Sequence, residues 1–578
     1  MLVKNSQLES DIKNIIWIDI DQFYGIEIEE WPARISEVAM WLIDHQMNMR
    51  VSEEFGEYFV RLPLKKTANI ICDNALRIDW ANIIVKNEID ITADVTNIIK
   101  ISEPPPHYNT VNVYTKEVNV IDSSAEKKPV SVKTTFDYIL GNPPFIGKNL
   151  QNENQKNDMG FVFAGFNNHS VLDYVTAWYI KAAKLIQASN TKVAFVSTNS
   201  ISQGEQTGLL WNILFNVYGL KIHFAHRTFK WSNEARGKAA VHVVIIGFAN
   251  YDTNEKYLFE YDDIKTEPHI RKVTNIGPYL IEGNDIIILK SKSPICSVPE
   301  ITFGNMPNDG GNLLLSDEEK KEILKINPES KKYIKPFLSA KEFINNINRW
   351  CLWLIDVDPT EIKSLTKVLE RVEAVKNHRV NSDRVATKKL SAYPTLFGEV
   401  RQPTNNFILI PRVSSENRKY IPISYFGSNY IVGDTCLAVP KAKIYHFGIL
   451  TSEMHMAWVR QVCGRLESRL RYSNDIVYNN FPWPENPTDK QIKLVEEKAQ
   501  KVLDTRKDFP NSSLADLYDP LAMPPSLVKA HQELDKAVDL CYRPQPFPNE
   551  TKRIEFLFEL YEKYTQPLLA EKKTKKKK

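Results

Sequence analysis

The 578-residue chain lacks the features of membrane, secreted and metal-stapled proteins. No apolar run approaches the roughly 20 residues that span a bilayer, and the first five residues, MLVKN, lack the charged start and apolar middle of a signal peptide. The six cysteines include no Cys-x-x-Cys pair and no histidine partner at zinc spacing, so we expect reduced packing residues and no metal. These absences predict a cytoplasmic protein without membrane contact, and its length predicts roughly three domains.

The chain also lacks a large excess of positive charge. Its formal net charge is only +3, with 74 basic and 71 acidic residues. A protein that binds nucleic acid through a global basic excess would carry far more. Any nucleic-acid contact must therefore come from local basic patches.

What is present is a rigid loop after a strand. Residues 136–147 read FDYILGNPPFIG, an apolar run followed by Gly141 and two prolines. This pattern predicts a buried strand that runs into the loop Asn142-Pro143-Pro144-Phe145. Two successive prolines fix φ and hold Asn142 extended, so its amide points in a set direction.

This loop suits methylation of an exocyclic amino group on a base. The nitrogen lone pair is delocalised into the ring until acceptors take its hydrogens, and the Asn142 side-chain oxygen and the Pro143 carbonyl are two such acceptors. Phe145 would stack on the base. The alternative is an ordinary proline-rich loop, although a given tetrapeptide arises by chance in a chain of this length about once in a few hundred cases.

Two acidic residues earlier in the chain are candidates for binding a nucleotide-like cofactor. Residues 23–29 predict a strand that ends near Glu27, and Pro32 opens a helix. Open α/β sheets bind ligands at the carboxyl ends of strands, where a carboxylate commonly holds two ribose hydroxyls. The alternative for Glu27 is a solvated turn carboxylate, because other glutamates follow it. Asp79 follows a second short apolar segment, which is predicted to be a further strand that ends at this carboxylate. The helix should pack through one apolar face, formed by Ile35, Val38, Ala39, Leu42 and Ile43.

Alternating strands and helices predict a doubly wound, mostly parallel sheet. Helical periodicity covers 173–186 and about 206–217, and apolar strands cover 191–201, 221–229 and 239–248, the last two as a hairpin. Residues 81–135 form an insertion without an assigned role, and 150–165 read as a polar loop that could close over a base. Phe229 and Trp231 are placed in the loop between the last two strands.

The Asn-Pro-Pro-Phe motif resembles the catalytic motif of amino-methylating DNA methyltransferases, in which asparagine in first place favours adenine over cytosine. A wider set of segments resembles the MmeI type of restriction-modification enzyme. The segments are FYGIEIEE (23–30), RTFKWSNEARG (227–237), DGGNLLL (309–315), RWCLWL (349–354), PRVSSE (411–416), MHMAWVR (454–460), CGRLES (463–468) and YNNFPWP (478–484). In that family one polypeptide combines nuclease, methyltransferase and target recognition.

The resemblance implies a class I methyltransferase fold that uses S-adenosyl-L-methionine on a flipped adenine in double-stranded DNA. Its catalytic residues would be Asn142, Pro143, Pro144 and Phe145, with Glu27, Asp79 and Asn142 at the cofactor. Phe145 and Phe229 would stack the two faces of the base. The alternative is that Phe229 is a core residue and Trp231 a surface aromatic. The residues expected to contact DNA are Arg227, Lys230, Arg236, Arg412, Arg418 and Arg465.

We expect an incomplete methyltransferase domain at 1–275, a mixed α+β target recognition domain at 276–485, and a C-terminal helical region with a Lys-rich tail at 486–578. No Asp-x-x-x-Gly-x-Gly turn precedes Glu27, so the expected first strand and Gly-rich cofactor loop are missing. Residues 454–471 are expected to form one helix that carries several arginines.

Two hypotheses follow. One is an adenine-specific DNA methyltransferase. The other is a recognition module that is inactive by itself, and that either needs a separate chain carrying the cofactor loop, which could also supply a nuclease, or is the remnant of a broken gene. An RNA or protein methyltransferase fits the recognition region less well.

Overall fold

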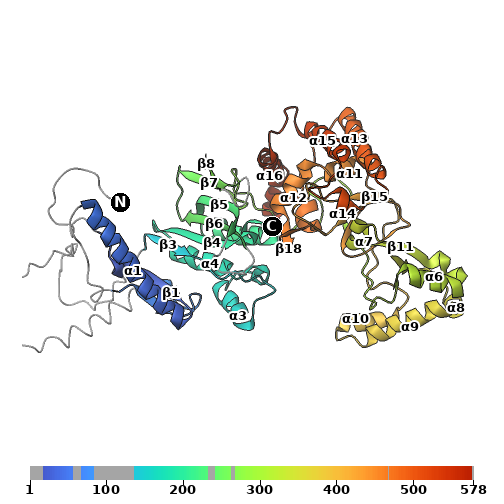
Figure 1. The fold of residues 1–578 in the computed structure, drawn as a ribbon, viewed down its shortest axis with the longest axis horizontal. Coiled ribbons are helices and arrows are strands. Elements are labelled where there is room, and N and C mark those ends of the chain that lie inside the picture. The colour runs from blue at the N-terminus through green and yellow to red at the C-terminus, as the bar shows by residue number, and fades with distance from the viewer. Residues whose placement is uncertain are drawn as a thin grey trace, which may run out of the picture. The chain divides into compact units, whose positions relative to one another are not determined.

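The computed structural model describes residues 17–55, 67–83, 136–231, 241–261, 267–466 and 468–575. The chain divides into two compact units (Figure 1). The first unit consists of Met1–Ile139, Ile146–Ser170 and Tyr174–Lys192; the second consists of Leu140–Phe145, Val171–Asp173 and Val193–Lys578. Among the described residues, no helix has both the length and the apolar character needed to cross a membrane.

The first unit contains a short parallel sheet and a long helix. Strands β1 (Tyr24–Glu27) and β2 (Asn69–Cys72) pair with Glu27 opposite Cys72. Helix α1 (Glu30–Phe55) begins two residues before Pro32. A 3-10 turn, η2 (Ile20–Gln22), precedes β1, and another, η3 (Trp80–Asn82), follows β2.

The predicted packing face of α1 is wrong. Ile35, Val38 and Leu42 are 51%, 59% and 56% exposed, and the residues that α1 buries include Ala33 and Asn48. The apolar stripe was read correctly as helical, but periodicity alone does not say which face meets a neighbour. In this chain a face of small and polar side chains is the buried one.

Two further helices lie among the described residues of the first unit. The segment 150–165, predicted as a loop, contains α3 (Glu153–Val162), so that prediction is wrong. Asn152 caps α3, and Gln155 returns a hydrogen bond to the Asn152 backbone, which forms a capping box. Helix α4 (Thr176–Leu185) falls where helical periodicity was predicted.

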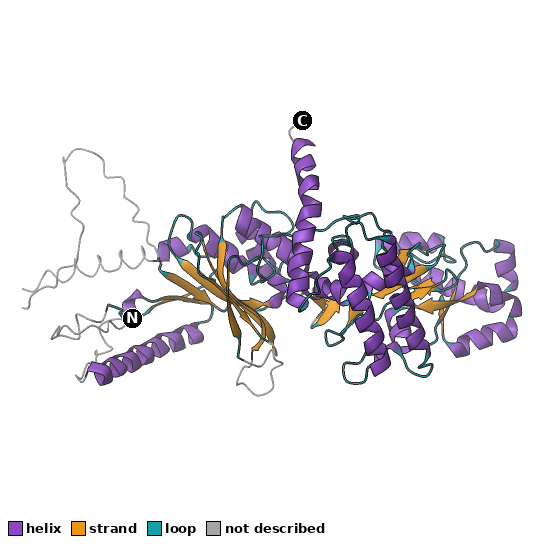
Figure 2. Cartoon of the chain, turned by 90° about the horizontal axis from the view of Figure 1, so that it is seen from above, coloured by secondary structure: helices purple, strands orange, loops and turns teal. Residues whose placement is uncertain are grey.

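The main sheet has six strands in the order β3-β4-β6-β5-β7-β8. Their bounds are β3 (Tyr138–Gly141), β4 (Lys192–Thr198), β5 (Lys221–Trp231), β6 (Val241–Ala249), β7 (Lys256–Glu260) and β8 (His269–Val273). The predicted hairpin is confirmed, since β5 and β6 pair antiparallel, whereas β5 and β7 pair parallel. Helix α5 (Gly204–Asn216) follows β4, as predicted. Helices lie beside the strands of this sheet (Figure 2), and the element order mixes helices and strands, which confirms an α/β fold.

Downstream of β8, the second unit contains three smaller sheets with orders β10-β12-β11-β16, β15-β13-β17-β9 and β14-β19-β18. Their strands are β9 (Thr302–Phe303), β10 (Leu314–Leu315), β11 (Ile334–Leu338), β12 (Trp350–Leu352), β13 (Phe407–Pro411), β14 (Val413–Ser414), β15 (Ser424–Phe426), β16 (Ile431–Val432), β17 (Cys436–Pro440), β18 (Gly464–Leu466) and β19 (Arg469–Arg471). The helices among them are α6 (Asp317–Ile326), α7 (Ala340–Asn345), α8 (Pro359–Ser364), α9 (Thr366–Val380), α10 (Val385–Lys389), α11 (Ile444–Leu450) and α12 (Glu453–Val462).

The helix predicted over 454–471 is only half present. Helix α12 ends at Val462, and β18 and β19 then form an antiparallel hairpin. The reason lies outside the segment, because α5 packs against it: a Cβ on Gly204, which has φ of +70°, would lie 2.7 Å from the Cα of Gly464. This close backbone contact fixes an extended chain where local periodicity favoured a helix.

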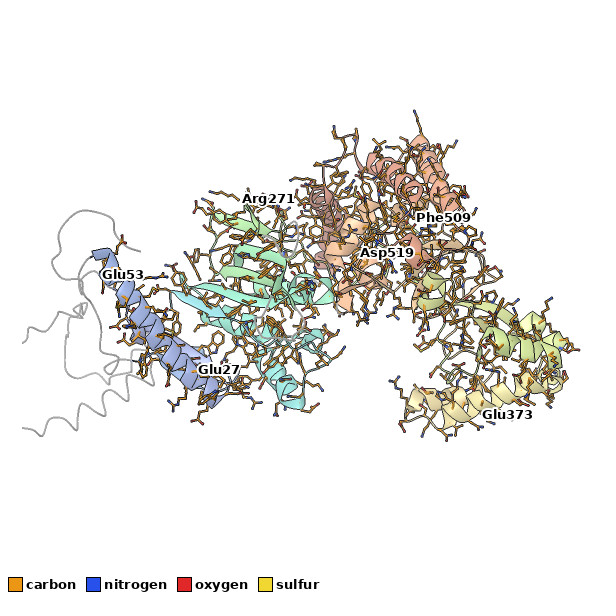
Figure 3. All side chains as sticks on the ribbon, in the orientation of Figure 1. Glu27, Glu53, Arg271, Glu373, Phe509 and Asp519 are labelled. Atoms are coloured by element: carbon orange, nitrogen blue, oxygen red, sulfur yellow. The ribbon has the colours of Figure 1, made fainter. Side chains whose placement is uncertain are left out.

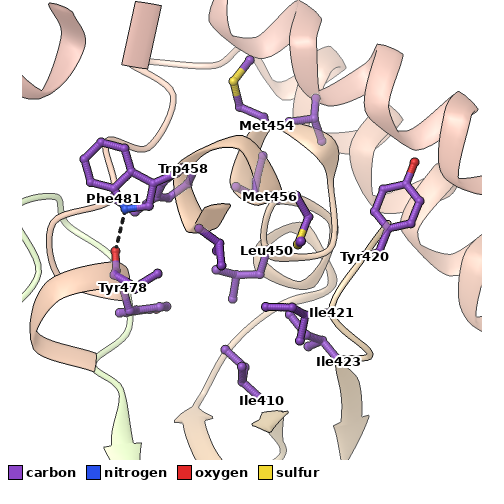
Figure 4. Packing of buried hydrophobic residues seen from close by; sticks show 14 of the residues in the cluster. Ile410, Tyr420, Ile421, Ile423, Leu450, Met454, Met456, Trp458, Tyr478 and Phe481 are labelled. Atoms are coloured by element: carbon purple, nitrogen blue, oxygen red, sulfur yellow. Dashed lines mark hydrogen bonds between the residues drawn. The ribbon is translucent and has the colours of Figure 1, made fainter. Parts of the chain in front are cut away.

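The C-terminal region is helical, as predicted, with α13 (Asp489–Lys507), α14 (Leu514–Leu517), α15 (Pro525–Tyr542) and α16 (Glu550–Lys575). Its core is shared with preceding strands and helices, around Trp458 and Phe481 (Figure 4). The Trp458 ring N–H donates to the Val477 carbonyl at 3.0 Å. Residues on both sides of position 485 belong to this one core, and the domain limits stay a prediction.

Candidate functional site

The Asn-Pro-Pro-Phe loop leaves the sheet directly at the end of β3. A Cβ on Gly141 would lie 3.0 Å from the Phe195 ring, so a glycine lets β3 lie close to its neighbour β4. In the loop, Asn142 and Pro144 are exposed, Phe145 is half-buried and Pro143 is buried. The loop is thus anchored through Pro143 while the Asn142 amide faces outward.

A polar cluster that the sequence analysis left unassigned lies in the same unit. Strands β3 and β4 run in the same direction. The Lys192 N–H, at the start of β4, donates to the Asp137 carbonyl just before β3, whereas Gly141, at the end of β3, lies beside Phe195, further along β4. Beyond β4, the Ser200 hydroxyl donates to Asp173 at 2.6 Å. Carboxyl ends of parallel neighbours share one edge of a sheet, so Ser200 belongs to the edge from which Asn142 emerges.

Gln206 completes this cluster. Its side-chain oxygen accepts from the Asp173 backbone N–H at 2.7 Å, and the Thr198 and Ser200 hydroxyls are 2.8 Å apart. The polar residues directly after the apolar strand β4 are the signal that could have identified this group from sequence.

The two predicted cofactor carboxylates lie in the first unit. Glu27 is the last residue of β1, which agrees with its predicted place at the carboxyl end of a strand. One Glu27 oxygen accepts from the Ile28 N–H at 2.9 Å, and the half-buried side chain leaves the second oxygen without a partner among the described residues. A carboxylate with a spare acceptor oxygen at a strand end fits a ribose hydroxyl.

Asp79 does not end a strand, contrary to the prediction. Strand β2 ends at Cys72, and Asp79 instead caps η3, where it accepts from the Ala81 N–H at 3.0 Å and from the Asn82 side chain at 2.9 Å. The apolar segment before Asp79 forms turns that start at Asn74, which explains why it resembled a strand only in composition. Its role at the cofactor stays a prediction.

A buried carboxylate organises the segment that leads to Asp79. The Asp158 side chain, 3% exposed, accepts from Arg77 Nε at 2.6 Å, from the Asn74 amide at 3.0 Å and from the Tyr174 hydroxyl at 2.7 Å. Burial acts to raise the pKa of Asp158, but these hydrogen bonds and the Arg77 charge outweigh it and hold the pKa below its usual value. The cluster thus fixes the turn after β2 onto α3 and α4.

Phe229 was predicted to lie in the loop after β5, and this prediction is wrong. The strand extends to Trp231, so Phe229 lies within it. One face of the Phe229 ring stacks on Tyr261 at 5.2 Å between centroids. His226 stacks on Phe259 at 4.0 Å and bonds Tyr261 through Nδ1 at 2.8 Å, and burial lowers the pKa of His226. Stacking of Phe229 on a base stays a prediction.

Two of the predicted DNA contacts, Arg227 and Lys230, lie on β5. Arg227 pairs with Glu260 at 3.1 Å and bonds Gln461 at 3.3 Å. Lys230 lies on β5, and Arg236 falls outside the described residues. Glu260 also pairs with Arg271 on β8, labelled in Figure 3. Arg227 is therefore part of an ion-pair network.

The other three predicted DNA contacts are partly engaged with the protein. Arg412 bonds the Asp434 carbonyl at 3.0 Å and lies 4.9 Å over the Phe303 ring. Arg465 bonds Gln203 and two backbone carbonyls, and burial lowers the pKa of both Arg418 and Arg465. The contacts of Arg412 and Arg465 are those of structural arginines, and DNA contact by all three residues stays a prediction.

Comparisons with known proteins match most of the chain to the domains of one family. Family models match as follows: the MmeI DNA-methyltransferase domain at residues 2–260, the MmeI target recognition domain at 282–485, and the MmeI C-terminal domain at 487–569. The chain is 39% identical over 552 residues to DNA methyltransferase A of Bacillus subtilis (strain 168), which covers 95% of this chain and 56% of that protein. The chain thus spans little more than half the length of this relative.

A solved structure agrees with these matches. The Type IIL restriction-modification enzyme MmeI in complex with DNA is 45% identical, with a TM-score of 0.75. The match covers 98% of this chain and 69% of that one.

Proposed function

This chain belongs to the MmeI family of restriction-modification enzymes, and from that premise we propose that it is a site-specific DNA methyltransferase. The reaction would move a methyl group from S-adenosyl-L-methionine to the exocyclic amino group of a flipped adenine, in a restriction-modification or phage-defence system. One observation carries the proposal: the exposed Asn142 amide is held at the end of β3 by a buried proline.

Asn142 and Pro143 would prepare the amino nitrogen for attack. Their side-chain and main-chain oxygens accept its two hydrogens, which localises the lone pair on nitrogen without any change of charge in the protein. Phe145 belongs to the same loop as Asn142 and is only half-buried, so it can present a ring face to the base. Because the loop is fixed before the base arrives, little reorganisation accompanies the reaction.

Glu27 and Asp79 would hold the cofactor. When bound, S-adenosyl-L-methionine supplies an electrophilic methyl group. The spare Glu27 oxygen suits the ribose hydroxyls. The Asp79 oxygens already serve the η3 cap, so a contact with the adenine ring would have to share them.

Replacement of Asn142 by Ala tests the catalytic assignment. We expect methyl transfer to genomic DNA, measured with a labelled cofactor, to fall by about 100-fold or more. Duplex binding should change little, because Asn142 is exposed and its side chain forms no hydrogen bond with the described residues. Asn216→Ala, at an exposed asparagine at the end of α5, is the matched control and should keep full activity. Full activity of Asn142→Ala would contradict the proposal.

A second candidate is a recognition module that needs a separate chain to complete its cofactor site. It is favoured by large apolar side chains that face solvent in the first unit and on β3, since Trp31 is 75% exposed, Tyr138 66% and Leu140 76%. Calorimetry with S-adenosyl-L-methionine separates the two candidates. Micromolar binding supports the methyltransferase, whereas retention of DNA without cofactor binding supports the module.

A further inference from the structure

A segment of the recognition region presents exposed cations without acidic partners. Residues 376–393, which we call the basic arm, contain the end of α9, all of α10 and the short helix η7 (Leu390–Ala392). Four of its basic residues are exposed, and Asp383 is its only carboxylate. The exposed cations are Lys376, Arg384, Lys388 and Lys389. Within the part of the chain that the structure describes, none of the four forms an ion pair.

The arm keeps like charges on one face. The Lys388 N–H donates to the Arg384 carbonyl at 3.0 Å, so these residues are one helical turn apart. Like charges at this spacing repel each other and destabilise a helix. Repulsion between the two cations therefore opposes formation of this turn. A polyanion bound to this face would offset it.

A buried arginine makes the arm rigid. Arg379 is fully buried near the end of α9, and its guanidinium donates only to backbone carbonyls. The acceptors are Asn308 (2.9 Å), Leu390 (3.1 Å), Tyr393 (2.8 Å), Pro307 (3.0 Å) and Leu396 (2.8 Å). One side chain therefore ties α9 to η7 and to a second loop. Cations on a preorganised scaffold lose less conformational entropy on binding than cations on a mobile one.

A glycine loop with open space beside it borders the arm. A Cβ on Gly310 would lie 2.8 Å from the exposed His378 ring, which places this loop against the end of α9. Gly311 is exposed, has φ of +85°, and no atom lies within 4 Å of the position of a Cβ. A large ligand can therefore approach the bare backbone beside the cations.

We propose that the basic arm is a phosphate-contacting surface for duplex DNA. Arg384, Lys388 and Lys389 bind the sugar-phosphate backbone and position the recognition region on the duplex, without reading bases. The inference rests on the proposed function for the identity of the polyanion. It assigns backbone contact to residues outside the predicted set, in which Arg227, Arg412 and Arg465 have partners within the protein.

The test is the salt dependence of duplex binding by the full chain. Fluorescence anisotropy with a mixed-sequence duplex is measured from low to moderate salt for wild type and for the triple variant Arg384→Ala, Lys388→Ala, Lys389→Ala. Each lost phosphate contact reduces the slope of log K against log salt by about 0.9, so we expect the slope to fall by about 2 to 3 and the affinity by about 100-fold near 0.1 M salt.

Two control proteins make the result specific. Lys490→Ala, Lys493→Ala, Lys536→Ala removes the same charge from exposed lysines of α13 and α15 and should leave the slope unchanged. The charge-retaining variant Arg384→Lys, Lys388→Arg, Lys389→Arg should bind with the wild-type slope.

An unchanged slope in the arm variant, with wild type bound to DNA, overturns the inference and leaves the proposed function intact. An equal loss in the α13 and α15 control also overturns it, since net charge alone would then explain binding. Methylation assays on the same proteins separate the two proposals. Wild type that binds DNA but transfers no methyl group overturns the proposed function only, and wild type that binds no duplex at low salt overturns both.

Discussion

Asp158 in the first unit and Asp535 in the second are both buried carboxyl groups, and their partners differ. Asp158 has the Arg77 guanidinium at 2.6 Å. Asp535 accepts from the Tyr420 hydroxyl at 2.6 Å and the Glu453 N–H at 2.7 Å, and both partners are neutral groups. Burial is the main cause that raises the pKa of Asp535 to about 7, and the nearby Glu453 carboxylate raises it further.

The comparison teaches that a cation in direct contact decides the charge of a buried carboxyl. Asp158 is an ion at neutral pH and holds three chain segments together. Asp535 keeps its proton up to near neutral pH and links Tyr420 to the start of α12. The two sites should therefore respond differently to substitution and to pH.

Removal of Asp158 is expected to have the largest effect. Asp158→Ala leaves the Tyr174 hydroxyl, the Asn74 amide and Arg77 without their acceptor, and we expect a loss of about 3 kcal/mol in the free energy of unfolding. Urea denaturation at pH 7 measures it. Asp137→Asn, at an exposed aspartate of the same unit, should be near neutral. Equal stability of Asp158→Ala and wild type would contradict the role of this ion as a clamp.

Asp535 predicts an effect that depends on pH. The unfolded carboxyl loses its proton near pH 4, whereas the folded one keeps it to about 7. Between these values the folded state binds more protons, so this group makes stability fall as pH rises, by about 1.4 kcal/mol per pH unit at most.

The variant Asp535→Asn isolates this contribution. The asparagine side chain cannot titrate, and it lacks the acceptor for one of the two hydrogen bonds. At pH 5 the variant should therefore be less stable than wild type. At pH 8, where wild type has lost the stabilising contribution of the proton, the difference in stability should disappear or change sign. Unfolding midpoints of both proteins at the two pH values test it, and the difference cancels the contribution of buried histidines such as His455, whose pKa burial lowers to about 3. A difference that is the same at pH 5 and pH 8 would rule out the raised pKa.

The smallest effect is expected on α1. Val38 is 59% exposed and Val162 is 1% exposed in the same unit. Val38→Ala should change the free energy of unfolding by less than about 0.5 kcal/mol, whereas Val162→Ala should cost about 2 kcal/mol. Thermal unfolding of the matched pair measures both. A large loss from Val38→Ala would mean that α1 is covered in solution, for example by the separate chain of the second candidate function.

Features set by local sequence were predicted well. The position of the strand before Asn142, the β5 and β6 hairpin and the C-terminal helices depend on periodicity and turn residues within one segment. The burial predicted for that strand is wrong, since Tyr138 and Leu140 of β3 are 66% and 76% exposed. Helix α3 was missed although its signal was local, since Asn152 and Gln155 have the spacing of a capping box.

Features set by distant residues were not predicted. Tyr420 and Asp535 are 115 positions apart, and the β18 and β19 hairpin depends on a contact between Gly204 and Gly464. The choice of buried face on α1 is of the same kind, because it depends on which element packs there. No pattern within a single segment carries that information.

The contact between α5 and the hairpin also constrains how this chain can drift in evolution. A Cβ at position 204 would collide with the Gly464 backbone, whereas a Cβ at position 464 would meet no atom within 4 Å. The constraint is one-sided: descendants of this sequence can accept other residues at 464 but should retain glycine at 204. A chimera of this chain with the recognition region of a relative therefore still needs glycine at position 204, which lies in the part that is kept.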